Sequence, residues 1–84
     1  MTRPVHELVI YSRPGCHLCE EMKVVIQLVQ RKIPFAVREV DISADANLER
    51  LYGIEIPILM IDGRKAAKYR ISEEELKRKL TPRH

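Results

Sequence analysis

The chain has 84 residues, of which 45% are hydrophobic and 32% are charged, and its formal net charge is +3. This length suits one small domain, and the composition is too apolar for a disordered chain. No apolar run approaches the roughly 20 residues of a membrane span, and the N-terminal residues lack the features of a signal peptide. We therefore expect a single cytoplasmic domain over residues 1–84, with an ordered core at about 7–80.

A strand and a helix are predicted at the start of the chain. Leu8–Tyr11 is a continuous apolar run that ends at the breakers Ser12–Gly15, a pattern typical of a strand buried on both faces. Apolar residues then recur every three or four positions over residues 16–32, which predicts a helix that ends before Pro34. The inward face of this helix consists of Cys19, Met22, Ile26, Val29 and Ile33.

A second strand and a short helix are predicted next. Phe35–Ile42 has strand propensity and ends in a polar segment. We expect Ser43 to cap a short helix, because a serine side chain accepts hydrogen bonds from first-turn amides. We also expect Leu48 and Leu51 to face the core. Gly53 fits the position after this helix, where glycine adopts left-handed geometry at little cost.

The last part of the chain predicts a hairpin and a final helix. Ile58–Ile61 is a second apolar run, and the Asp-Gly pair at 62–63 is a strong hairpin signal that leads into a strand at about 65–69. Ser72–Glu75 is a capping box, which predicts a helix that runs to about residue 80. The core positions of this region are Ile71, Leu76 and Leu80.

These elements predict an α/β fold with the order β-α-β-α-β-β-α. The first two strands should pair in parallel through a right-handed crossover, and the hairpin should add an antiparallel pair. The predicted product is a four-stranded mixed sheet flanked by three helices, with helices on both faces of the sheet.

The two cysteines, Cys16 and Cys19, lie three positions apart at the start of the first predicted helix. First-turn amides of a helix have no intrahelical acceptor, so they stabilise an anion such as a thiolate. Arg13 adds a positive charge nearby, and His17 adds another when it is protonated. These groups are expected to lower the pKa of Cys16 from about 8.5 toward values at which the thiolate predominates at neutral pH.

Cys19 lies one helical turn further on and faces inward, so we expect its thiol to be buried and to keep a higher pKa. This predicts that Cys16 attacks a disulfide and that Cys19 resolves the mixed disulfide, which leaves a Cys16–Cys19 disulfide. A Cys-x-x-Cys pair beside a βα pattern is typical of redox proteins. In an alternative interpretation the two cysteines are small core residues. One chain lacks the four ligands of a zinc site, but two chains could share a metal or iron–sulfur site.

The segment Tyr11–Cys19, which reads YSRPGCHLC, resembles the active-site segment of glutaredoxins, Y-S-K-P-x-C-P-Y-C. Ile56-Pro57 resembles the T-V-P segment of the same family, although position alone predicts an ordinary trans proline at a strand start. The similarity spans about residues 7–80 and is nearest to small glutaredoxin-like proteins with a C-H-L-C motif. That family belongs to the thioredoxin superfamily, so the resemblance implies a thioredoxin-like fold.

The resemblance implies an enzyme, a dithiol thiol–disulfide oxidoreductase in which Cys16 is the nucleophile and Cys19 the resolving thiol. It implies that Pro57 is cis and lies beside the cysteines, and that the Ile56 main chain pairs with an extended thiol substrate. Arg13 takes the place of a carboxylate-binding lysine of the family. The candidate substrate-binding residues are Arg13, His17, Ile56 and Pro57.

The substrate stays open between protein disulfides and glutathione mixed disulfides, because residues 68–73 lack the Gly-Gly-x-Asp segment that receives part of glutathione in glutaredoxins. We expect a monomer without bound cofactor or metal, with glutathione as a reductant or co-substrate, and without nucleic-acid or membrane partners. A further hypothesis is a non-catalytic binding module with inert cysteines. Its basic segment 64–84, with 8 Lys or Arg and 3 Glu for a net charge of +5, would dock an acidic partner.

Overall fold

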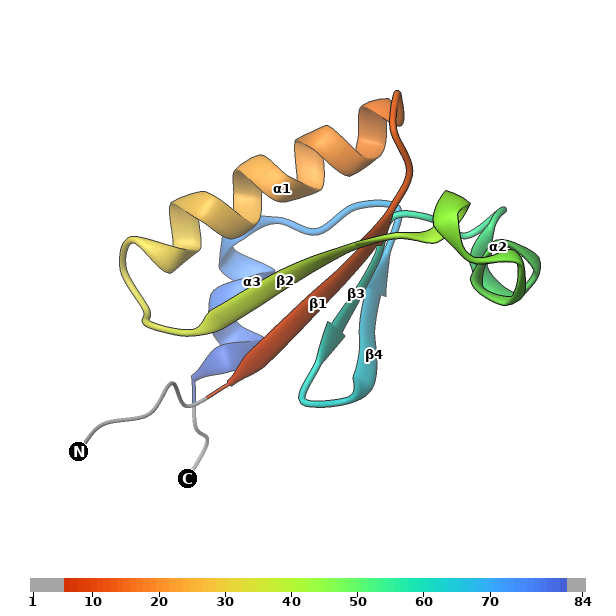
Figure 1. Cartoon of the computed structure of the whole chain (residues 1–84). Helices are drawn as coiled ribbons and strands as arrows, with labels where there is room; N and C mark the ends of the chain where they lie inside the picture. The colour runs from red at the N-terminus through yellow and green to blue at the C-terminus, as the bar shows by residue number, and fades with distance from the viewer. Residues whose placement is uncertain (1–5, 82–84) are drawn as a thin grey trace.

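The structure is a computed structural model that describes residues 6–81. The elements are β1 (Glu7–Ser12), α1 (His17–Gln30), β2 (Ala36–Asp41), the 3-10 turn η1 (Ile42–Ala44), α2 (Ala46–Tyr52), β3 (Ile58–Ile61), β4 (Arg64–Lys68) and α3 (Glu73–Leu80). Figure 1 shows their arrangement, with the strands side by side and α1 running along them. The predicted order of strands and helices is confirmed.

The four strands form one mixed sheet in the order β2-β1-β3-β4. β1 pairs in parallel with β2 and antiparallel with β3, and β3 pairs antiparallel with β4. The predicted thioredoxin-like α/β fold is therefore confirmed. Because Tyr11 pairs with Ile58, the carboxyl end of β1 lies beside the start of β3. This register brings the segment before Cys16 next to the segment that carries Pro57.

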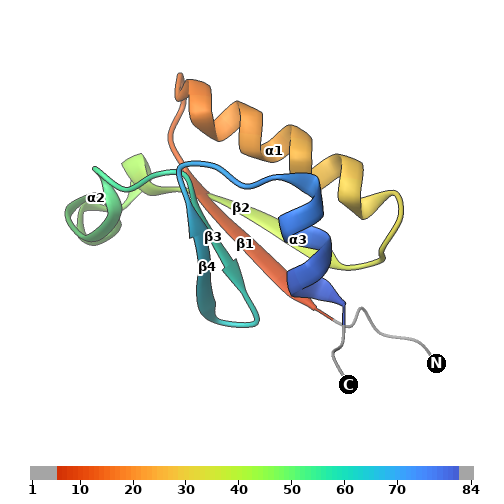
Figure 2. The ribbon, with the colours of Figure 1, turned by 180° about the vertical axis from the view of Figure 1, so that it is seen from behind.

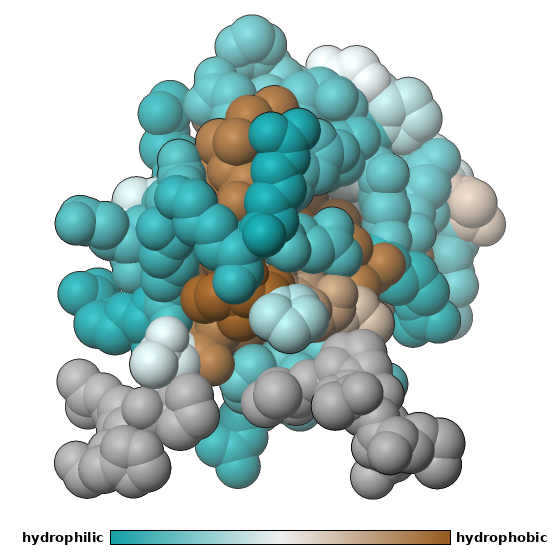
Figure 3. Space-filling model, turned by 90° about the vertical axis from the view of Figure 1, so that its left-hand side faces the viewer, coloured by the Kyte–Doolittle hydropathy of each residue, from teal (hydrophilic) through white to brown (hydrophobic). Residues whose placement is uncertain are grey.

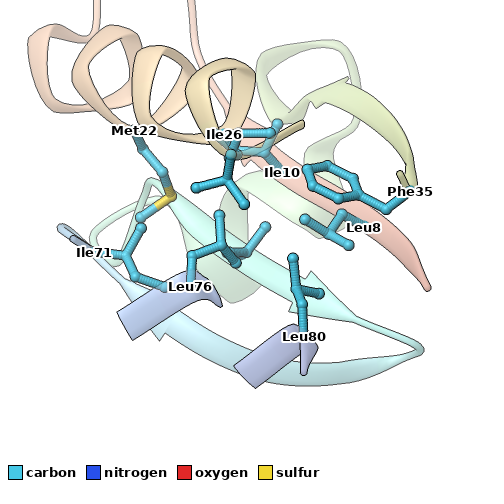
Figure 4. Close-up of a cluster of buried hydrophobic side chains, with 10 residues drawn as sticks. Leu8, Ile10, Met22, Ile26, Phe35, Ile71, Leu76 and Leu80 are labelled. Atoms are coloured by element: carbon cyan, nitrogen blue, oxygen red, sulfur yellow. The ribbon is translucent and has the colours of Figure 1, made fainter. Parts of the chain in front are cut away.

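α1 and α3 lie on the same face of the sheet, as the two opposite views show (Figures 1 and 2). Leu8 and Ile10 point into the core from β1 and are each 1% exposed, since alternate side chains of a strand share a face. Figure 4 shows them meeting side chains from both helices. The inward faces predicted for α1 and α3 are confirmed except for Ile33, which lies beyond the end of α1 at Gln30 and is half-buried against the core. The core cluster consists of Leu8, Ile10, Met22, Ile26, Val29, Phe35, Leu59, Ile71, Leu76 and Leu80.

α2 lies at one end of the sheet (Figure 1). Tyr52 of α2 stacks on Tyr11, with ring centroids 4.9 Å apart, and Tyr11 points away from the face that carries Ile10. Further along this second face the cross-strand partners Val9 and Met60 are only half-buried. Helices therefore lie on both faces as predicted, but α2, a helix of 7 residues about 10 Å long, covers only one end of the second face.

The predicted N-cap of α2 is wrong. Asp45 caps this helix, because its carboxylate accepts hydrogen bonds from the first-turn amides of Asn47 and Leu48 at 2.8 and 3.2 Å. Ser43 lies in η1, where its amide donates to the Asp41 carboxylate at 2.9 Å. Two aspartates four positions apart therefore divide the segment into a 3-10 turn and a helix, where one helix from Ser43 was expected.

The predictions for Leu51 and Gly53 are also wrong. Leu51 is 61% exposed, and α2 contains no buried residue, because the helix lies outside the main core. Gly53 has right-handed dihedral angles, with φ −55° and ψ −33°. A Cβ atom on Gly53 would lie 2.5 Å from the Glu49 carbonyl oxygen. Close packing therefore requires glycine at this position. The sequence instead predicts glycine here for its left-handed geometry.

The predicted Asp-Gly hairpin is confirmed. Asp62 and Gly63 have φ angles of +51° and +83°, the left-handed values that a type I′ turn requires. β4 ends at Lys68, one residue earlier than expected, because Tyr69 has a φ of +72°. The second strand is likewise shorter than the predicted Phe35–Ile42, since Ile42 begins η1.

Figure 3 shows the side of the molecule that lies at the left in Figure 1. Hydrophilic residues cover most of this side, and hydrophobic residues gather in its middle. Within residues 6–81, no helix is both long enough and apolar enough to cross a membrane.

Candidate functional site

The first cysteine lies on a tight turn between β1 and α1. Gly15 has a φ of +79°, which glycine adopts readily, and the Cys16 amide donates to the Arg13 carbonyl at 3.2 Å. Cys16 is the N-cap of α1 in extended geometry, and its Sγ accepts a hydrogen bond from the Cys19 amide at 3.1 Å. The sulfur therefore occupies the place at which free amides of the helix N-terminus stabilise negative charge.

Cys16 and Cys19 form a disulfide, and their Cα atoms are 5.2 Å apart. Cys19 is fully buried, as predicted from its position on the inward face of α1, whereas Cys16 is only half-buried. An approaching thiol or disulfide therefore reaches Cys16 more easily than Cys19. The roles of an attacking and a resolving cysteine stay predictions.

The Ile56-Pro57 peptide bond is cis, as the family resemblance implies and contrary to the expectation from position alone. Pro57 is buried, and Ile56 is half-buried. Because Tyr11 pairs with Ile58, Pro57 comes opposite the end of β1, where the cysteine turn begins. The Tyr69 amide donates to the Pro57 carbonyl at 2.8 Å, and the Tyr69 hydroxyl donates to the Ile54 carbonyl at 3.1 Å. The segment before α3 thus holds the proline loop in place.

The guanidinium of Arg13 points to the end of α2. Its Nη2 donates to the Glu49 carboxylate and lies 3.4 Å from the Gly53 carbonyl oxygen. Both side chains of the ion pair are partly exposed, Arg13 at 38% and Glu49 at 39%. The chain itself therefore supplies a carboxylate to the residue that was expected to bind a substrate carboxylate.

His17 lies next to Cys16 but points into solvent. Its side chain is 88% exposed, and Nε2 lies 3.1 Å from the Glu21 carboxylate one turn further along α1. Arg70, from the segment before α3, also faces Glu21, at 3.9 Å. The structure thus places His17 at the rim of the site, while Cys16, Cys19 and the proline loop form its centre.

A network of polar side chains lies behind the cysteine turn. The buried Ser12 hydroxyl donates to Glu39 at 2.8 Å, and Lys23 lies 2.9 Å from the same carboxylate. Lys23, and then Ser12, lower the pKa of Glu39, while hydrogen bonds to Glu20 and Glu39 raise the pKa of Lys23. This network holds the end of β1 and the first turns of α1 together.

A shallow cavity of about 310 Å³ runs between α1 and the segment before α3. Its apolar lining includes Met22, Val25 and Ile71, and Tyr69 links it to the proline loop. No group of three or more His, Cys, Asp or Glu side chains within residues 6–81 is arranged to hold a metal ion.

Sequence reasoning missed Glu49, Gly53 and Tyr69 as parts of the site. Glu49 and Gly53 lie 36 and 40 positions after Arg13, and nothing in the sequence pattern of α2 marks them as partners of an arginine. The sequence pattern predicts Tyr69 in the last strand, whereas its contacts with the proline loop depend on a positive φ angle that is rare for a non-glycine residue. Only the three-dimensional contacts reveal these residues.

Comparisons with known proteins agree with this geometry. The family model described as a glutaredoxin-like domain (DUF836) matches residues 7–81. A Dictyostelium discoideum protein called "Glutaredoxin-like protein YDR286C homolog" is 33% identical over 72 residues, which cover 79% of this chain and 67% of that protein.

Solved structures are similar over most of the chain. Protein Ne2328 from Nitrosomonas europaea has a TM-score of 0.79 and 30% identity, with 96% of each chain covered. The crystal structure of protein XcR50 from X. campestris has a TM-score of 0.75 and 30% identity, with 87% of this chain and 93% of that chain covered. A mutant thioredoxin from Halobacterium salinarum has a TM-score of 0.65 and 20% identity, with 92% of this chain and 73% of that chain covered. At this identity the similarity supports the fold and nothing more.

Proposed function

The chain belongs to the glutaredoxin-like domain family (DUF836), and on this basis we propose that it is a dithiol thiol–disulfide oxidoreductase. The observation that carries the proposal is the Cys16 sulfur. It caps α1, accepts a hydrogen bond from the Cys19 amide at 3.1 Å and forms a disulfide with the buried Cys19. A sulfur at this place is stabilised as a thiolate, which is the form of cysteine that attacks disulfides.

In the proposed reaction the reduced protein donates two electrons to a substrate disulfide. The Cys16 thiolate attacks one sulfur of the substrate, the substrate S–S bond breaks, and the other substrate sulfur leaves as a thiolate. The Cys19 thiol then loses its proton to solvent and attacks the Cys16 sulfur. This step forms the Cys16–Cys19 bond and releases the second substrate thiolate. An external dithiol, or two molecules of a monothiol such as glutathione, reduces the disulfide again.

The arrangement around the cysteines supports an extended substrate in this reaction. Pro57 lies opposite the end of β1, and the main chain of the half-buried Ile56 precedes it at the same edge of the site. A polypeptide or glutathione main chain could pair with Ile56 as an added strand, which would bring its sulfur to Cys16. We propose this pairing as the binding mode for protein disulfides and for glutathione mixed disulfides, in a cytoplasmic monomer without a resident cofactor.

Single cysteine variants test the proposal. The variant Cys16→Ser should lose reduction of hydroxyethyl disulfide, because no thiolate remains at the helix N-cap. The variant Cys19→Ser should instead accumulate a mixed disulfide with the substrate, visible as a mass increase that a reductant removes. The exposed Ser43→Ala on η1 is the matched control and should keep wild-type activity. Full activity in both cysteine variants would refute the proposal.

A further inference from the structure

We propose that Glu49 is a specificity-determining residue that occupies Arg13 and so weakens binding of substrates that carry a carboxylate near the reacting sulfur. The inference rests on the proposed function, because it concerns which disulfides reach Cys16. It predicts that the protein prefers substrate segments without a carboxylate beside the disulfide over small acidic thiols such as glutathione.

The first argument is the geometry of Arg13. Its guanidinium donates to the Glu49 carboxylate and faces the Gly53 carbonyl oxygen at 3.4 Å, so both neighbours are acceptors. Hydrogen bonds from the Ser43 side chain and amide lower the pKa of the nearby Asp41, and the charge of Arg13 adds a smaller lowering. The positive charge beside the cysteine turn therefore already faces a carboxylate and a carbonyl group of the chain.

The second argument is the packing that allows this contact. Gly53 closes α2 in right-handed geometry, and a Cβ atom there would lie 3.0 Å from Glu49 Oε1 and 3.3 Å from Arg13 Nη2. A side chain at this position would crowd both members of the pair. The glycine that leads from α2 toward the proline loop thus leaves room for the carboxylate to reach the guanidinium.

The third argument is the position of the ion pair between the cysteine turn and the segment that leads to Pro57. Arg13 belongs to the turn that carries Cys16, whereas Gly53 leads directly into the segment that ends at Pro57. A substrate carboxylate that approaches this side meets Glu49 as a competitor for Arg13 and as a like charge. Because both side chains are partly exposed, the ion pair is weak, and a substrate carboxylate can displace Glu49 from Arg13. Glu49 therefore weakens the binding of such substrates without preventing it.

Binding of S-methylglutathione tests the inference without any redox chemistry. This probe carries both carboxylates of glutathione and has no free thiol. We would follow backbone amide shifts of the wild-type protein and of E49Q at low ionic strength, where surface charges are least screened. The E49Q protein should bind about 1.5 to 5 times more tightly, the range expected for release of an exposed ion pair. The gain should disappear in R13Q/E49Q.

Two controls isolate the effect. Glu73 pairs with Lys32 and is 40% exposed, against 39% for Glu49, so E73Q removes the same charge at an equally exposed place away from the cysteines. E73Q should leave S-methylglutathione binding unchanged. E49A, a second substitution that removes the carboxylate, should repeat the gain of E49Q if the amide spectrum shows that it is folded.

The inference is overturned if E49Q and E49A bind S-methylglutathione as the wild type does, if E73Q gives the same gain, or if the gain survives in R13Q/E49Q. Reduction of hydroxyethyl disulfide by the wild-type protein separately tests the proposed function. A protein that fails to reduce this disulfide but shows the predicted gain on E49Q would refute the proposed function and keep Glu49 as the group that occupies Arg13.

Discussion

At the scale of single residues, Asp62 joins three parts of the fold. Its carboxylate accepts a hydrogen bond from the Glu7 amide at 2.9 Å and from His6 Nδ1 at 2.6 Å. The other ring nitrogen of His6 lies 3.0 Å from the Leu80 carbonyl oxygen at the end of α3. The Asp62 carboxylate thus links the hairpin turn to the start of β1, and the His6 ring links both to the end of α3.

The His6 ring and then the Glu7 amide lower the pKa of Asp62 below its ordinary value of 3.8. A carboxyl group with a lowered pKa in the folded state stabilises the fold above its unfolded pKa and loses this effect as the pH falls through the folded value. We therefore predict that Asp62→Asn lowers the free energy of unfolding at pH 5. The difference from wild type should shrink as the pH falls below about 4. Asparagine tolerates the positive φ of this position, so the turn itself should survive.

Urea denaturation of wild type and Asp62→Asn at several pH values measures this difference. The exposed Glu74→Gln, which removes a carboxylate of α3 away from the hairpin, controls for the general loss of charge. A stability difference for Asp62→Asn that stays constant from pH 5 to pH 2 would contradict the assigned role of the carboxylate.

The central residues of the site could be predicted from the sequence, and their partners could not. The positions of Cys16 and Cys19 follow from local pattern, because helix periodicity shows which cysteine faces inward and which opens the helix. The partner of Arg13 depends on how α2 lies against the cysteine turn, about 36 residues along the chain. Contacts of that sequence separation are set by packing, and no periodicity encodes them.

At the scale of elements, the end of α2 depends on Gly53. Alanine usually stabilises a right-handed position relative to glycine, because it restricts the unfolded chain. Here the Cβ atom would lie 2.5 Å from the Glu49 carbonyl oxygen, a distance that forces the backbone to shift. We predict that this steric cost exceeds the gain from restricting the unfolded chain. Gly53→Ala should therefore lower the free energy of unfolding by about 1–3 kcal/mol. Urea denaturation measures the change, and a variant as stable as wild type or more stable would show that the helix end relaxes freely.

Element boundaries could be predicted where one strong signal stands alone. The Asp-Gly turn places the β3–β4 hairpin correctly, because both residues accept the left-handed angles of the turn. The segment between β2 and β3 contains several competing caps, Asp41, Ser43 and Asp45, and the sequence gives no basis for ranking them. The two aspartates cap η1 and α2 in the structure, and Ser43 caps neither.

At the scale of the whole molecule, one face of the sheet carries the main core. Leu76 of α3 is fully buried in the core cluster, whereas Leu51 of α2 is 61% exposed. We predict that Leu76→Ala costs about 2–5 kcal/mol, because it removes buried methyl groups and leaves a cavity. Leu51→Ala should change stability by less than about 0.5 kcal/mol. Since domains of this kind are stable by only about 5–15 kcal/mol, Leu76→Ala could unfold much of the population.

Denaturation curves of the two leucine variants measure this contrast. Equal losses of stability in Leu76→Ala and Leu51→Ala would mean that α2 belongs to the core, as the sequence pattern predicts. The overall fold was predictable because the apolar runs, the period of α1 and the hairpin signal agree with one another. The position of α2 could not be predicted, since a short amphipathic helix fits equally well over a sheet face or at its end.

The central claim is that Cys16 and Cys19 form a reversible redox pair. The most direct measurement equilibrates the protein with a series of ratios of reduced to oxidised glutathione, alkylates the free thiols and determines the mass of each species. We predict one two-electron transition between a form with two free thiols and a form with the Cys16–Cys19 disulfide. Two thiols that stay free across the whole series would contradict the proposed function.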